Sequence, residues 1–123
     1  MQRSRSHRFT KNNRLLDASS FSQVFAKAHR SRDKWFTVLC RNNEMTSARL
    51  GLAISKRNCK KAVGRNRIKR IIRESFRQEQ HELEGLDIVV MNQAAASDAG
   101  SQELFASLTQ HWRRCAKTRV NRP

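Results

Sequence analysis

The densest group of side chains able to do chemistry is a basic run between residues 56 and 77. This run holds ten Lys or Arg residues and a single acid, Glu74. Arginine guanidinium groups bind phosphate through paired N–H groups and stack on bases, and Asn66 adds one donor and one acceptor group among them. The run therefore predicts binding of a polyanion through its phosphates. These residue types do not distinguish DNA from RNA.

The remaining charge is also gathered in blocks. The 123 residues carry a net charge of +16. Residues 1–14 and 113–122 each hold five Lys or Arg and no acid, whereas residues 78–112 hold six acids and no Lys or Arg. Positive charge that served solubility alone would be interspersed with acids. The blocked pattern favours a surface that lies against phosphate.

Residues for hydrolysis are hard to find. The sequence lacks the Gly-x-Ser-x-Gly, His-Glu-x-x-His and phosphate-loop motifs. None of the four histidines has an evident base partner, and the acids near residues 79–87 are expected to form a solvated surface. The three cysteines form no Cys-x-x-Cys pair and are expected to be reduced thiols. We therefore assign no catalytic residue and no protein-bound metal or cofactor.

A long amphipathic helix is expected to present the basic run. From about Val63 to Leu83, the apolar side chains recur on one face at 100° per residue. Arg67 lies on a flank, and Arg65 lies at the helix start toward the apolar side. The opposite arc is almost purely polar and cationic: Asn66, Lys69, Arg70, Arg73 and Arg77.

The other elements are expected on both sides of this helix. A first helix with a capping box at Ser20 and Gln23 should end near His29-Arg30. Strands are expected at 34–41, 48–55 and 86–91, the last one central because it is nearly all apolar. Residues 94–100 read as a loop, and Ser101 can cap a last helix. The order is α-β-β-α-β-α, with room for a further short strand.

These elements make one domain. We expect a basic and disordered arm at residues 1–13, an α/β domain at 14–117 and a basic tail at 118–123. The longest apolar runs are far shorter than a membrane span, and the N-terminus does not look like a secretory signal. The protein is therefore expected to be soluble and cytoplasmic.

The motif within the basic run resembles one protein family closely. Arg65-Asn66-Arg67, continued by Ile68-Lys69-Arg70 and by residues 73–77, is similar to the protein subunit of bacterial ribonuclease P. The strand sequence of residues 49–57 and the opening Arg14-Leu15 also resemble that family. The likeness covers about residues 12–115. One departure is visible at Asn58-Cys59-Lys60-Lys61, where many members have a glycine, and it concerns the local loop shape.

The resemblance implies both a fold and a function. The fold would be α+β, a two-layer sandwich like domain 2 of ribosomal protein S5 with a left-handed β-α-β crossover. The protein would bind ribonuclease P RNA, which itself performs the Mg²⁺-dependent removal of the 5′ leader from precursor tRNA. It would thus be the accessory protein subunit of an endoribonuclease, with Mg²⁺ acting through the RNA. No membrane and no obligate protein partner is implied.

The resemblance also assigns residues. A cleft between the first helix and the sheet would hold the single-stranded leader, with Phe21 and Phe25 as aromatic platforms. From spacing alone, core packing is the simpler interpretation of both phenylalanines, and Trp112 is expected in the core. The residues that would face the catalytic RNA are Arg65, Asn66, Arg67, Lys69, Arg70 and Arg73.

Four other functions stay open as alternatives. A structural RNA-binding protein of the ribosome would share the charge and size. A DNA-binding regulator is disfavoured by the strands and by the missing helix-turn-helix spacing. A self-sufficient nuclease would need more acids around a metal ion. A membrane-surface helix is disfavoured because the apolar face of the long helix is needed for the core.

Overall fold

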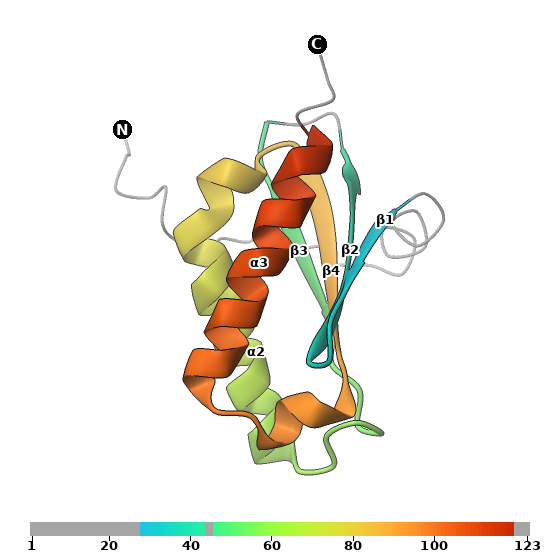
Figure 1. Cartoon of the computed structure of the whole chain (residues 1–123), viewed down its shortest axis with the longest axis vertical. Helices are drawn as coiled ribbons and strands as arrows, with labels where there is room; N and C mark the ends of the chain where they lie inside the picture. The colour runs from blue at the N-terminus through green and yellow to red at the C-terminus, as the bar shows by residue number, and fades with distance from the viewer. Residues whose placement is uncertain (1–27, 44–45, 120–123) are drawn as a thin grey trace.

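A four-stranded sheet with two α-helices packed on one face makes up the part of the chain that is described. The computed structural model describes residues 28–43 and 46–119. Figure 1 shows helices and sheet as two layers, which confirms the expected α+β class. The elements are β1 (His29–Arg32), β2 (Phe36–Asn42), β3 (Arg49–Ala53), α2 (Ala62–Glu79), β4 (Leu86–Asn92) and α3 (Ser101–Arg119), with short 3-10 helices η3 (Gln80–Leu83) and η4 (Ala94–Asp98).

The strand order is β1-β2-β4-β3. β4 lies between β2, to which it is antiparallel, and β3, to which it is parallel. Its central place was expected from its apolar sequence. Because β3 and β4 are parallel neighbours joined through α2, these three elements form a β-α-β unit.

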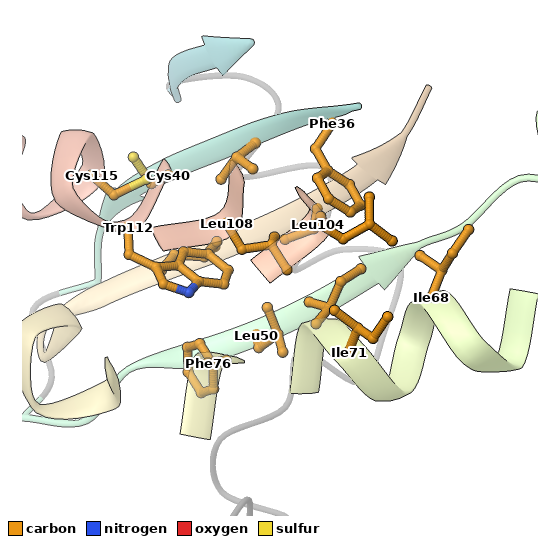
Figure 2. Packing of buried hydrophobic residues seen from close by; sticks show 14 of the residues in the cluster. Phe36, Cys40, Leu50, Ile68, Ile71, Phe76, Leu104, Leu108, Trp112 and Cys115 are labelled. Atoms are coloured by element: carbon orange, nitrogen blue, oxygen red, sulfur yellow. The ribbon is translucent and has the colours of Figure 1, made fainter. Parts of the chain in front are cut away.

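The main core lies between the sheet and the helices. The inward face of α2 is made by Ile68, Ile71, Ile72, Ser75 and Phe76, as its periodicity predicted. Trp112 of α3 is 2 % exposed. The ring centroids of Trp112 and Phe76 lie 6.0 Å apart in an edge-to-face arrangement. Trp112 Nε1 donates to Ser75 Oγ at 2.8 Å. Figure 2 shows Trp112 and Phe76 among the packed apolar side chains, and the burial of Trp112 confirms it as a core residue.

Two thiols meet in the same core. Cys40 and Cys115 are both buried, and Figure 2 shows them side by side between β2 and α3. Each is present as a free cysteine, as is the buried Cys59. The expectation of reduced thiols therefore agrees with the structure, although cysteines far apart in the sequence are neighbours in space.

The expected end of the first helix is wrong. His29 and Arg30 belong to β1, which pairs with Cys40 and Leu39 of β2. The four residues of β1 are all polar, so pairing with β2 rather than an apolar alternation makes them a strand. β1 is the further short strand for which the sequence left room. The rest of the predicted helix, with Ser20 and Gln23, lies outside the described residues, as do the predicted arm at 1–13 and the end of the tail.

Two smaller expectations also need correction. Residues 94–98 form the 3-10 helix η4 rather than an irregular loop. Ser101 is already the first residue of α3, and Gly100 takes the capping position. The Gly100 carbonyl accepts from Leu104 N at 3.1 Å, and Gly100 N donates to Glu103 Oε1 at 3.0 Å. A glutamate that reaches back in this way satisfies an N–H at the helix start.

The long helix ends close to its expected limit. α2 runs to Glu79 and continues as η3 to Leu83. Gly85 follows with a φ of 84°, a backbone conformation that side chains other than glycine rarely adopt. Along the described ranges, no helix combines the length and apolar composition that crossing a bilayer would need.

Candidate nucleic-acid interface

The outward face of α2 is a continuous cationic surface, which we call the α2 face. Asn66, Arg70 and Arg73 are exposed, and Lys69 is half-buried. Together with Glu74 and Arg77, the three exposed residues line a hollow of about 430 Å³ along the helix. The structure thus places four of the six expected RNA-contacting residues on one accessible surface. Their side chains form no hydrogen bond or ion pair with other described residues.

Glu74 is the single acid on the α2 face. Both of its carboxylate oxygens accept from the Arg77 guanidinium, with Nε to Oε1 at 3.2 Å. The hydrogen bond from Arg77 holds the pKa of Glu74 below its ordinary value. Glu74 is therefore ionised at neutral pH, and its ion pair is with Arg77 rather than with Arg70 or Arg73.

Arg65 is bound to the loop that precedes α2. Its Nη1 donates to the backbone carbonyls of Cys59 at 3.0 Å and Lys60 at 2.8 Å. The loop packs tightly here, since a Cβ on Gly64 would lie 2.9 Å from Cys59 Sγ. Arg65 therefore holds the loop against the first turn of the helix. Its position toward the apolar side, expected from the sequence, allows these hydrogen bonds.

Arg67 is bound to the other helix. Its Nη2 donates to the Ala99 carbonyl at 2.7 Å, with Ser101 Oγ at 3.4 Å. This contact joins the first turns of α2 to the start of α3. Arg65 and Arg67 were both expected to face RNA, but the structure gives each of them an internal partner. Only Asn66, between them, points fully outward.

Two asparagines that sequence reasoning missed hold the loop in place. Asn92, buried at the end of β4, accepts from Ser55 N through Oδ1 at 2.8 Å. Asn58 Nδ2 donates to the Asn92 carbonyl at 2.9 Å, and Asn58 N donates to Ser55 Oγ at 3.1 Å. The exposed Lys56 and Arg57 lie on this loop. A polar residue at the end of an apolar strand was the only signal for Asn92.

A second surface is the sheet face that carries no described helix, which we call the open face. Leu39 and Val89 form its apolar centre, with Ala28, Ala53 and Met91 packed against them. This face is the expected place of the leader cleft. Phe21 and Phe25 lie outside the described residues, so their expected contacts stay predictions.

The open face also holds an ion pair that the sequence did not reveal. Asp87 is fully buried, and Arg49 donates to both of its carboxylate oxygens at 2.8 Å. Asn43 Nδ2 donates to Asp87 Oδ1 at 2.9 Å. The expectation that Asp87 belongs to a solvated acidic surface is therefore wrong. The neighbouring strand β3 supplies the arginine that neutralises it.

A buried polar network ties β1 to α3, and sequence reasoning missed it as well. Ser31 Oγ lies 2.7 Å from His111 Nδ1, and His111 Nε2 lies 3.2 Å from Asp33 Oδ2. Asp33 also accepts from Ser107 Oγ at 2.6 Å and from the backbone N–H groups of Trp35 and Phe36 at 2.9 Å each. The expectation that no histidine lies near a base partner is wrong for His111.

This network is not a hydrolytic triad. The serine meets Nδ1 and the aspartate meets Nε2, the reverse of the arrangement in serine hydrolases. His111 is fully buried, so a substrate has no access to it.

Burial lowers the pKa of His111, and the nearby Asp33 carboxylate offsets this only in part. Burial alone would raise the pKa of Asp33, but its hydrogen bonds from Ser107, Phe36 and Trp35 bring it below its ordinary value.

The side chains described here do not gather into a metal site. Within residues 28–43 and 46–119, no three His, Cys, Asp or Glu side chains lie close enough to hold an ion together. The chemistry that the α2 face can perform is binding of phosphate, through bidentate and single contacts from its arginines and its lysine.

Comparison with known proteins identifies the family. The sequence model of the Ribonuclease P family matches residues 9–116. The ribonuclease P protein component of Vibrio campbellii is 43% identical over 109 residues, which cover 89% of this chain and 92% of that protein. The component of Methylococcus capsulatus is 46% identical over 112 residues, with 88% of each chain covered.

A solved structure agrees with the sequence matches. The RNase P protein of Staphylococcus aureus superposes with a TM-score of 0.77 at 33% identity, covering 85% of this chain and 95% of that one. This likeness is consistent with the S5 domain 2-like arrangement expected from the resemblance. Family match, identity and fold all lead to the same result, and the chain belongs to the family of ribonuclease P protein components.

Proposed function

We propose that this chain is the RNA-binding subunit of a ribonuclease P ribonucleoprotein that removes the 5′ leader of precursor tRNA. The α2 face binds ribonuclease P RNA, and the open face receives the single-stranded leader. The Mg²⁺-dependent hydrolysis takes place on the RNA. The observation that carries this proposal is the α2 face itself, where Asn66, Arg70 and Arg73 stand exposed with no partner among the described residues.

The mechanism has two parts. Positive charge on the protein offsets the repulsion between catalytic RNA and substrate RNA, so the substrate binds at lower Mg²⁺ concentration. Contacts to the leader then favour precursor over mature tRNA, which lacks the leader. Stacking and backbone contacts tolerate many base sequences, which suits leaders of varied sequence.

The test is cleavage of a 5′-extended precursor tRNA at low Mg²⁺ concentration. Protein alone, bacterial ribonuclease P RNA alone and the two together are compared. We expect efficient cleavage only with both present. Cleavage by the protein alone would contradict the assignment of catalysis to RNA. No gain over the RNA alone, with RNA binding intact, would favour the ribosomal or general RNA-binding alternative instead.

A further inference from the structure

The side chains of β1 alternate between two environments. Ser31 is buried, whereas Arg30 and Arg32 are exposed. Arg30 pairs with Leu39, and Arg32 pairs with Thr37. Directly opposed residues of an antiparallel pair lie on the same face of a sheet. Since Leu39 belongs to the apolar centre of the open face, the two arginines lie on that face.

Arg30 and Arg32 give the open face a charged rim. Leu39 is 3 % and Val89 0 % exposed, whereas the arginines at the edge of this face are accessible. Neither arginine forms an ion pair with the other described residues. Of the strand residues in the described ranges, Asp87 is the one acid on this face, and Arg49 neutralises it. The rim is therefore cationic.

The other side of β1 is anchored to α3. Ser31 Oγ accepts from Arg114 Nη1 at 3.1 Å and contacts His111 Nδ1 at 2.7 Å. At the end of the strand, Asp33 lies against His111 and Ser107. A four-residue strand with one described neighbour is marginal on its own. The buried network fixes its position from behind and leaves its front face accessible.

We propose that Arg30 and Arg32 bind phosphates of the single-stranded 5′ leader, and that Ser31 and His111 are positioning residues that hold β1 for this contact. The inference rests on the function proposed above and adds the residues that carry it at this edge. The two arginines are two residues apart on a strand, roughly 6.7 Å. They can therefore engage successive parts of an extended backbone, and contacts to phosphate carry no base preference.

The test uses the full-length chain assembled with ribonuclease P RNA. Dissociation constants are measured for a precursor tRNA with a 5′ leader and for mature tRNA. For Arg30→Gln/Arg32→Gln we expect a loss of precursor affinity of roughly tenfold to hundredfold, with mature tRNA unaffected. The slope of log affinity against log salt for the precursor should fall by about 1.4, or 0.7 for each lost contact to a single strand.

A matched control removes the same charge elsewhere. Arg113→Gln/Lys117→Gln changes two exposed cations of α3 and should leave the preference for precursor unchanged. If both double variants lose precursor affinity equally, the effect is one of net charge and the inference is overturned. If the wild type prefers precursor and Arg30→Gln/Arg32→Gln keeps that preference, the role of the two arginines is overturned while the proposed function stands. A wild type without any preference would contradict the proposed function itself.

The positioning role has its own readout. Ser31→Ala removes the hydroxyl that joins His111 and Arg114 and should weaken precursor binding roughly threefold to tenfold, again without an effect on mature tRNA. Ser31→Thr restores a hydroxyl at the same place and should recover the affinity. Equal losses for precursor and mature tRNA would show that Ser31 supports the fold alone.

Discussion

The first turns of α2 and the turns that follow carry arginines in very different environments. Arg65 and Arg67 donate to backbone carbonyls of the preceding loop and of Ala99. Arg70 and Arg73, one and two turns further, are exposed and line the hollow on the α2 face. The same residue type thus forms internal hydrogen bonds at one end of the helix and is exposed along the rest.

This difference shows that one basic motif contains both arginines that hold the fold together and arginines that are free to bind a ligand. The first arginines fix the loop and the second helix relative to α2, so the later ones stand on a rigid base. Asn66 is exposed like the later group, although the motif places it between Arg65 and Arg67. Substitutions in the two groups should therefore have separable effects on stability and on RNA binding.

The largest effect is expected for the exposed pair. Arg70→Gln/Arg73→Gln removes two phosphate contacts, and at about 1.4 kcal/mol each the affinity for ribonuclease P RNA should fall roughly 100-fold. The melting temperature should stay the same, because neither side chain has a partner among the described residues. Filter binding measures the affinity for the RNA, and thermal unfolding measures the melting temperature. A large drop in melting temperature would contradict the division between the two groups.

The next effect is expected at the internal end. Arg67→Lys keeps the charge but loses the planar group that reaches Ala99, so the free energy of unfolding should fall by about 1–2 kcal/mol. Arg70→Lys is the matched control and should change it by less than about 0.5 kcal/mol. Urea denaturation measures both. Equal stability of the two lysine variants would mean that the Arg67 contact does not matter.

Much of this organisation could be predicted from local pattern. The period of 3.6 identified α2 and its cationic face, and the apolar run identified β4 as central. The internal partners of Arg67 and Asp87 could not be predicted, because Ala99 and Arg49 lie 32 and 38 residues away along the chain. β1 was missed as a strand for the same reason, since its polar residues are ordered by β2 and α3.

His111 extends the comparison to a group that is entirely internal. Burial keeps its pKa below the ordinary 6.5, against the pull of Asp33 and with the help of Arg114. Below pH 6.5 the unfolded chain therefore binds a proton that the folded chain does not, and stability decreases as the pH falls. The pKa of Asp33 is lowered from 3.8, so its own contribution is lost only at more acidic pH.

We expect the stability of the protein to depend on pH, and we expect His111→Gln to remove part of this dependence. Between pH 6.5 and about 4, the free energy of unfolding of the wild type should decrease, and His111→Gln should flatten this decrease. Urea denaturation at several pH values measures it. An identical decrease in both proteins would place the responsible group elsewhere.

The smallest effect concerns the contact between the first turn of α2 and the loop that precedes it. Gly64→Ala gains helix propensity of about 1 kcal/mol, but the new Cβ would lie 2.9 Å from Cys59 Sγ. We expect a slight net destabilisation in the wild type and a stabilisation of up to about 1 kcal/mol in a Cys59→Ala background. Chemical denaturation of the four proteins in this cycle checks it. Additive effects would show that the two residues do not collide.

The salt dependence of binding tests the central claim, that the α2 face contacts RNA phosphates, most directly. The affinity of the chain for ribonuclease P RNA is measured across a series of salt concentrations for the wild type and for Arg70→Gln/Arg73→Gln. We expect the slope of log affinity against log salt to fall by about 1.4–1.8 in the variant, or 0.7–0.9 for each lost contact. An unchanged slope would mean that these arginines do not touch the phosphates of the RNA.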